Sequence, residues 1–90
     1  MRESEIEAYL VKRVREAGGV TYKFSSPSHA GVPDRVVILH GRVGFLELKA
    51  PGKKPTALQQ REIDRISAQG VPAYWADGRE GVDYFMGQLN

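Results

Sequence analysis

Apolar residues recur at helical spacing in two segments of the chain, and each segment opens with the same kind of capping signal. The two apolar series are Ile6, Tyr9, Leu10, Val14 and Ala17, and then Leu58, Ile63 and Ile66. Ser4 with Glu7, and Thr56 with Gln59, have the spacing of a capping box, in which two side chains satisfy backbone N–H groups at a helix start. Glycines follow the end of each series. The pattern predicts helices that begin near Ser4 and near Thr56.

Between and after these helices, short apolar runs bounded by turn-forming residues are typical of strands. Asp34–His40 and Val43–Lys49 are two such runs, and Gly41-Arg42 between them predicts a two-residue hairpin turn. Val20–Ser25 and Pro72–Ala76 predict two further strands.

A last apolar series over Arg79–Leu89 predicts a short final helix, so the predicted order of elements is α-β-β-β-α-β-α. Both faces of the hairpin carry apolar side chains, which requires helices on both faces of a mixed sheet. The sequence therefore predicts an α/β fold with one domain over residues 1–90. The apolar side of the final helix is a candidate surface for a dimer contact.

Composition narrows the class of protein. A chain of 90 residues hides only roughly 60–65% of its unfolded surface, which makes a homodimer a reasonable expectation. The absence of cysteine excludes a disulfide framework and a thiolate zinc site, and it suits a reducing cytoplasm. Neither a membrane-spanning run nor a signal peptide is recognised. A net charge of +2 and a pI near 9.1 permit nucleic-acid binding without requiring it.

Three charged side chains interrupt the apolar hairpin: Asp34, Glu47 and Lys49. Side chains alternate across a strand, and a turn at Gly41-Arg42 places Asp34 opposite Lys49. The same register places Glu47 opposite Val36. All three charged groups are therefore expected on one face, at one end of the hairpin.

A pair of carboxylates at this position has the chemistry of a site for a hard divalent cation such as Mg²⁺. Asp34 and Glu47 are the candidate ligands, and the backbone carbonyl of Leu48 is a third. A bound cation would activate a water against a phosphodiester, and Lys49 would orient that water or stabilise the developing charge. The alternative is a cross-strand ion pair of little energetic value, but charged groups on an otherwise apolar face favour the metal site.

Two residues on the helices have a double interpretation. Glu7 lies at the edge of the buried stripe of its helix, so that it either faces the sheet or closes the Ser4 capping box. Glu3, one turn earlier, is an equal candidate for the acid of this helix. Gln59 either closes the Thr56 capping box or, on the core-facing side, completes the site.

Basic and small polar side chains form a candidate surface for a phosphate backbone. The candidates are Lys23, Ser25, Ser26, Arg35, Lys53 and Lys54. His29, in the loop between the first two strands, is either a general base or simply an exposed side chain.

These motifs resemble the PD-(D/E)xK nuclease superfamily and, within it, the stand-alone virus-type replication-repair nuclease (VRR-NUC) domains found in phages. Residues 31–35 resemble the G-x-P-D-R segment of that family, and residues 47–55 resemble its E-x-K motif with the basic loop that follows. Residues 56–59 match the glutamine that opens the next helix. The resemblance covers essentially the whole chain, in order.

The resemblance implies a restriction-endonuclease-like core and a role for each matched residue. Asp34 and Glu47 would ligate Mg²⁺ or Mn²⁺, Lys49 would serve the water, and Gln59 would support the site. Residues 6–11 are similar to the corresponding helix of archaeal Holliday-junction resolvases, which implies that Glu7 reaches the metal, directly or through a water. Glu3 remains the alternative.

The family also implies an activity and its setting. The expected protein is a homodimeric, metal-dependent DNA endonuclease that cleaves structured DNA, four-way junctions above all. It needs no organic cofactor and no membrane, and it would work in the host-cell cytoplasm if a phage encodes it. A nicking, flap or restriction-like endonuclease is the alternative within the enzyme class. A non-catalytic DNA-binding module on the same fold is the alternative outside it.

Overall fold

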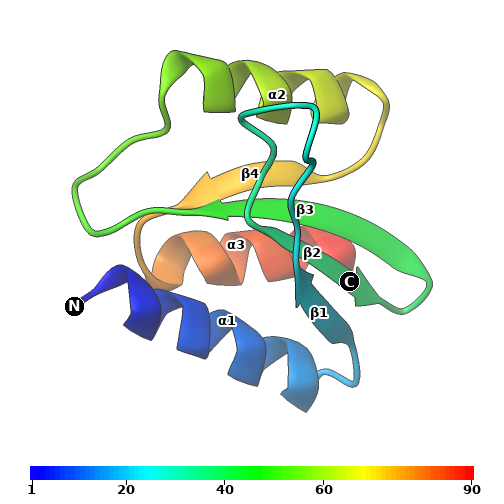
Figure 1. Ribbon diagram of the computed structural model, residues 1–90. Coiled ribbons are helices and arrows are strands. Elements are labelled where there is room, and N and C mark those ends of the chain that lie inside the picture. The colour runs from blue at the N-terminus through cyan, green and yellow to red at the C-terminus, as the bar shows by residue number, and fades with distance from the viewer.

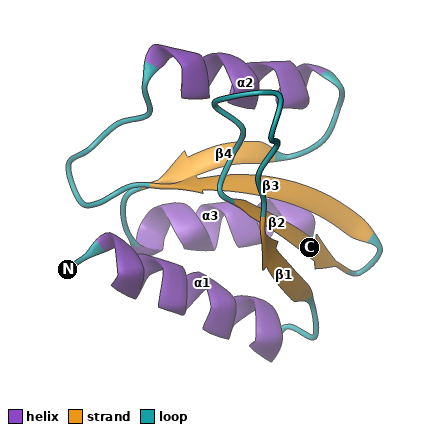
Figure 2. Ribbon diagram, in the orientation of Figure 1, coloured by secondary structure: helices purple, strands orange, loops and turns teal.

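The computed structural model describes residues 1–90, and its elements follow the predicted order (Figure 2). Strands β1 to β4 form one mixed sheet in the order β1-β2-β3-β4. The pairs β1–β2 and β2–β3 are antiparallel, and β3–β4 is parallel. The α/β fold class is thus confirmed. The elements are α1 (Glu3–Glu16), β1 (Val20–Lys23), β2 (Arg35–Leu39), β3 (Arg42–Leu48), α2 (Ala57–Ala68), β4 (Ala73–Ala76) and α3 (Arg79–Leu89).

Helices lie on both faces of the sheet, with α1 and α3 on one face and α2 on the other (Figure 1). The main core lies on the side of α1 and α3, because the apolar stripes of both helices meet the inward residues of β2 and β3 there. None of the helices is both long and apolar enough to span a membrane. The core residues are Ile6, Leu10, Val14, Val37, Leu39, Leu46, Leu48, Ala76, Val82, Phe85, Met86 and Leu89.

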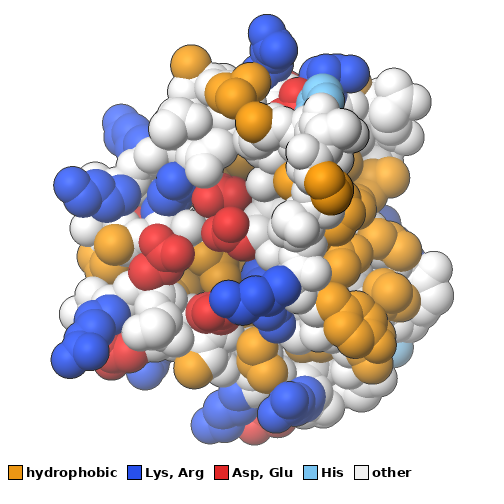
Figure 3. Space-filling view, in the orientation of Figure 1, with side chains coloured by type: hydrophobic (Ala, Val, Ile, Leu, Met, Phe, Trp, Pro, Cys, Tyr) orange, Lys and Arg blue, Asp and Glu red, His pale blue; other side chains and the backbone are white.

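On the other face, α2 covers only part of the sheet. Ile63 of α2 is buried, as is Ala73 of β4. Towards the hairpin turn, four apolar side chains are 38–59% exposed: Val20, Tyr22, Ile38 and Val43. Strand pairing puts these four on one face, here called the exposed sheet face. Figure 3 shows apolar side chains gathered on this side of the molecule.

The hairpin turn lies one residue earlier than predicted. His40 and Gly41 form it, with φ of 53° and 78°, because a tight hairpin turn that follows the strand twist needs left-handed backbone at both central residues. The register therefore shifts by two residues, and Val36 pairs with Phe45 instead of Glu47. A shift of two keeps every side chain on its predicted face, so only the predicted partners were wrong.

The start of α1 also differs from the prediction. The helix begins at Glu3, and the carboxylate of Glu5 accepts the backbone N–H of Arg2 at 2.8 Å. The predicted capping box of Ser4 and Glu7 is therefore wrong, since both residues lie inside the helix. This leaves the carboxylate of Glu7 free for tertiary contacts.

Two predictions about apolar residues are corrected by burial. Phe85 and Leu89 of α3 are fully buried in the core of their own chain, so the apolar side of this helix is not available for a dimer contact. Among the large apolar side chains of that helix, Tyr84 alone is exposed, at 58%. Leu58, predicted on the buried stripe of α2, is 42% exposed. The buried residues of α2 are Glu62 and Ile63.

Candidate active site

Glu47 lies at the centre of the candidate site and is only 2% exposed. One carboxylate oxygen, Oε2, accepts a hydrogen bond from Nε2 of Gln59 at 3.3 Å and lies 3.6 Å from Nζ of Lys49. The other oxygen, Oε1, is buried without a hydrogen-bond partner. Buried carboxylate oxygens without partners are rare in folded proteins, so this atom points to a group that the protein chain itself does not supply.

Asp34 lies just before β2 and reaches across to β3. Its Oδ2 accepts the backbone N–H of Leu48 at 3.2 Å, which holds the carboxylate beside Glu47. Burial and the neighbouring charge of Asp34 raise the pKa of Glu47 to about 7, against an opposing effect of Lys49. Two carboxylates held this close repel each other when both are ionised.

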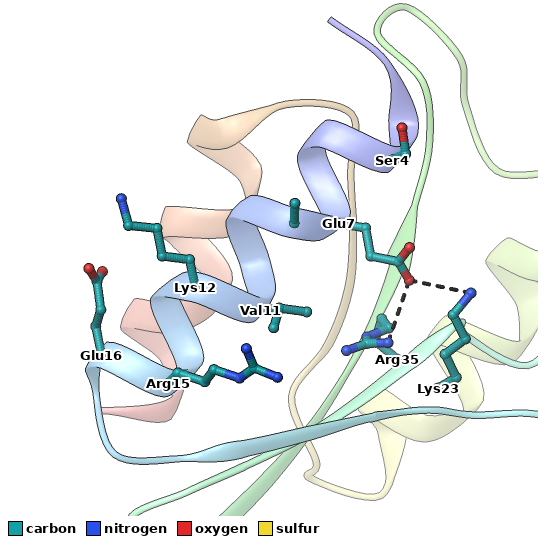
Figure 4. Close-up of a pocket in the computed structure, with 9 residues that line it drawn as sticks. Ser4, Glu7, Val11, Lys12, Arg15, Glu16, Lys23 and Arg35 are labelled. Carbon is teal, nitrogen blue, oxygen red and sulfur yellow. Dashed lines mark hydrogen bonds and ion pairs between the residues drawn. The ribbon is translucent and has the colours of Figure 1, made fainter.

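Glu7 approaches the same end of the hairpin from α1. Its Oε2 lies 3.5 Å from Nη1 of Arg35 and 3.8 Å from Nζ of Lys23 (Figure 4). Its side chain is 29% exposed, so it stands at the rim of the site instead of in the core. Glu3 is exposed and lines the same hollow as Glu7 and Asp34.

Gln59 fulfils both interpretations of its sequence position. At the start of α2 the side-chain oxygen Oε1 of Gln59 accepts a hydrogen bond from the backbone N–H of Thr56 at 2.9 Å, and the backbone N–H of Gln59 donates to Thr56 Oγ1 at 3.2 Å. Its Nε2 remains free to donate to Glu47. The capping box thus fixes the amide orientation that the site uses.

The predicted phosphate-contacting residues are not all brought together. Lys23 and Ser25 line the hollow of the candidate site. Lys53 and Lys54 are exposed in the loop before α2 and do not line that hollow. Ser26 is half-buried in the loop after β1, and Arg35 is buried in β2 with a side chain that is 8% exposed.

Sequence reasoning missed a contact that anchors the loop between β1 and β2. Nε2 of His29 lies 2.9 Å from Oε1 of Glu62 on α2, and Nη1 of Arg65 lies 3.3 Å from Oε2. The hydrogen bond from His29 lowers the pKa of Glu62. His29 therefore holds the loop against α2, and it does not line the hollow of the site. The spacing of Glu62 and Arg65 on one helix face could have predicted their own ion pair, but not the contact with His29.

The acidic residues fit a hard divalent cation. No group of three or more His, Cys, Asp or Glu side chains is arranged to hold a metal ion by itself. Mg²⁺, however, is usually held by one or two carboxylates together with waters and a substrate phosphate. The free Oε1 of Glu47 and the repulsion between Glu47 and Asp34 are the features that such a cation would satisfy. Figure 3 shows acidic side chains gathered between α1 and α2, with Lys and Arg side chains around them.

Comparison with known proteins finds two similarities that cover most of the chain. The chain is 54% identical over 81 residues to "Putative nuclease p44" of Acyrthosiphon pisum secondary endosymbiont phage 1, a match that covers 89% of this chain and 87% of that protein. It is also similar to a solved structure described as a VRR_NUC domain. That similarity has a TM-score of 0.86 and 29% sequence identity, and it covers 98% of this chain and 97% of the other. No family model matches the chain.

Proposed function

Because the chain belongs to the VRR-NUC domain family of nucleases, in the PD-(D/E)xK superfamily, we propose that it is a divalent-metal-dependent DNA endonuclease. The proposed substrate is structured DNA, four-way junctions above all. Residues 1–90 would form one nuclease domain that acts as a homodimer in the cytoplasm, which is the cytoplasm of the host cell if a phage encodes the chain. The observation that carries the proposal is the pair of the half-buried Asp34 and the buried Glu47, with Lys49 and Gln59 on the second carboxylate.

The proposed ligands of Mg²⁺ or Mn²⁺ are Asp34, Glu47 and the backbone carbonyl of Leu48, with Glu7 reaching the ion directly or through a water. Such an ion supplies a water of lowered pKa and neutralises charge on the phosphate. Oε1 of Glu47, which lacks a partner, supports this assignment. Glu7 is preferred to Glu3, because its carboxylate is less exposed and is already directed towards Arg35 and Lys23.

The other site residues act on the water and on Glu47. Nζ of Lys49 lies close enough to the site to orient the attacking water or to stabilise the charge that builds up on the phosphate. The water oxygen forms a new bond to phosphorus while one ester P–O bond breaks. Gln59 holds one oxygen of Glu47, so that the other oxygen remains without a partner and available to an ion.

The homodimer follows from the substrate and is supported by the surface. Paired cuts on a four-way junction require two sites at a fixed separation, which two copies of this chain would provide. The exposed sheet face is an apolar surface next to the free edge of β1, and apolar patches of this kind commonly mark interfaces. The same face on both copies would form a two-fold contact.

A cleavage assay tests the proposal. The purified protein is incubated with a four-way junction, a linear duplex, a flap and a single strand, in Mg²⁺, in Mn²⁺ and in EDTA. We expect metal-dependent cleavage that is fastest on the junction. Equal cleavage of the linear duplex would reject the junction preference, and faster cleavage of the flap would favour a flap nuclease.

The variants Asp34→Asn and Lys49→Ala test the assigned residues. Both remove charge from the site while preserving the core, so each should reduce cleavage by at least about 100-fold with little change in Tm. Full activity in either folded variant would contradict the role assigned to the substituted residue. DNA binding by the wild-type protein without any cleavage in either metal would favour a non-catalytic binding module.

A further inference from the structure

A second hollow runs beside the candidate site, between α1 and the first two strands (Figure 4). Its volume is about 580 Å³, compared with about 310 Å³ for the hollow that contains Asp34. Val11 and Arg15 line one wall from α1, Lys23 lines the other from β1, and Arg35 lies between them on β2. We call this hollow the α1 groove.

The α1 groove is continuous with the candidate site. Glu7 and Lys23 line both hollows, so the groove opens where Glu7 meets the acidic pair. At its other end it shares Val11, Arg15 and Arg35 with a third hollow beside the start of β1. The three hollows together form one path that leads away from the site along α1.

Positive charge is concentrated in the groove. Four Lys or Arg residues and two Glu residues line it, so the lining alone has a net charge of +2, equal to that of the whole chain. Arg15 forms no ion pair within the chain, and in Figure 4 its guanidinium points towards Arg35. Lys12 and Glu16 point away from the space between Arg15 and Arg35.

Arg35 shows that this positive charge is incompletely satisfied. Its side chain is 8% exposed, yet its Nε has no hydrogen-bond partner and its contact with Glu7 is long, at 3.5 Å. A buried guanidinium is stable when acceptors meet its donors, and phosphate oxygens match its fork geometry. A phosphate in the groove would therefore complete an arrangement that the chain leaves open.

We propose that the α1 groove holds the phosphate backbone of the cleaved DNA strand next to the scissile bond. Arg15 and Arg35 bind one flanking phosphate, and Lys23 binds the phosphate between it and the acidic site. This inference rests on the proposed nuclease function and assigns the path by which the strand enters the site. Such contacts fix the register of the strand without reading its sequence.

The test compares Arg15→Ala with Arg42→Ala. Arg42 is exposed beside the hairpin turn, at the end of β3 that is far from Glu47. Both variants therefore lose one positive charge, but only Arg15→Ala loses it from the α1 groove. Binding to a labelled four-way junction is measured by fluorescence anisotropy in EDTA at several salt concentrations, so no cleavage is involved. Arg15→Ala should weaken binding about tenfold at low salt and reduce the slope of log K against log salt by about one. Arg42→Ala should change binding less than about twofold, and Arg15→Lys should restore most of the slope.

A second measurement locates the phosphate. Neutral methylphosphonate linkages are placed one at a time on either side of the cleaved bond. One linkage should weaken binding of the wild-type protein and have no further effect on Arg15→Ala, because the two changes remove the same contact. Suppose that the wild-type protein binds and cleaves DNA. If Arg15→Ala then behaves like Arg42→Ala, or if every linkage that weakens wild-type binding weakens binding of Arg15→Ala equally, the groove assignment is rejected and the proposed function is not. If wild-type protein binds no DNA, the proposed function is rejected with it.

Discussion

At the scale of single residues, Glu47 combines two properties that conflict in the absence of a cation. It is almost fully buried, and it stands beside a second carboxylate. The fold therefore favours the neutral form of Glu47 up to about pH 7. A cation in the site would favour the ionised form at lower pH, so that metal affinity and local stability would be linked through this one side chain.

Glu47→Gln should stabilise the metal-free protein at pH 8, although we expect it to abolish the proposed cleavage. The pKa of Glu47 rises from 4.5 to about 7 on folding, so the folded state holds a proton that the unfolded state has lost, and stability falls as the pH rises through this range. The neutral amide does not suffer this loss. We expect a gain of about 2–3 kcal/mol at pH 8, shrinking to less than about 1 kcal/mol at pH 5.

Urea denaturation in EDTA at the two pH values measures this difference. Glu16→Gln, an exposed position at the end of α1, is the matched control and should change stability by less than about 0.5 kcal/mol at either pH. A Glu47→Gln variant that is less stable than the wild type at pH 8 would contradict the inferred burial penalty.

The residues of the site differ in how well the sequence predicts them. Asp34, Glu47 and Lys49 stand out because charge interrupts apolar strands, and alternation alone places them on one face. Glu7 is ambiguous, because its position suits both a cap and the sheet, and only its tertiary contacts with Arg35 and Lys23 decide. The link between His29 and Glu62 joins a loop to a helix that is distant in sequence, which no local pattern reports.

At the scale of elements, the loop between β1 and β2 connects the site to α2. Gly31 in this loop has φ of +89°, and a Cβ added there would lie 2.8 Å from Cγ of Leu58. His29 anchors the same loop through Glu62. The loop thus packs on the helix that carries Gln59, while its end positions Asp34.

Gly31→Ala should destabilise the protein more than Gly52→Ala does. Both glycines have left-handed backbone, at +89° and +82°, but nothing lies within 4 Å of a Cβ added at Gly52. The control variant suffers only the strain of a Cβ in left-handed backbone, about 1 kcal/mol, and Gly31→Ala should lose roughly 1–2 kcal/mol more by displacing Leu58. Urea denaturation measures both, and equal losses would show that the loop does not pack tightly on α2.

Element boundaries show where sequence patterns are sufficient. The cap of α2 and the range of α3 are as predicted, because local side-chain chemistry decides both. At the site, β1 ends two residues and β3 one residue earlier than predicted, and β2 begins one residue later, which leaves Asp34 and Lys49 just outside the ladder. The hairpin turn was misplaced because Gly41 was assigned to its first position, whereas the left-handed residue before it is His40.

At the scale of the whole molecule, burial is unequal on the two faces of the sheet. The core under α1 and α3 is closed, whereas the exposed sheet face leaves Tyr22 and Ile38 at 59% and 38% exposure. The apolar pattern predicted cover on both faces but not how far α2 extends over the second. Helix length and crossover path decide this, and neither is encoded in strand alternation.

Ile38→Asp should convert the proposed dimer to a monomer. A carboxylate at the centre of a two-fold apolar contact would face its copy, and like charges there would repel each other. Tyr84→Asp is the control, because Tyr84 is 58% exposed on α3, on the opposite face. Analytical ultracentrifugation should find Tyr84→Asp dimeric like the wild type and Ile38→Asp monomeric and folded. A dimeric Ile38→Asp, or a monomeric wild type, would rule out this interface.

The hairpin register has a consequence for how chain length can vary in evolution. Asp34 and Glu47 lie equally far in sequence from the turn at His40 and Gly41, so the two arms of the hairpin place them opposite each other. An insertion at the tip, or one residue added to each arm, keeps the two carboxylates on the same face as each other. A single residue lost from one arm would place them on opposite faces unless a bulge absorbed the change. Length changes between the two acids are thus tolerated at the tip or in pairs across the strands.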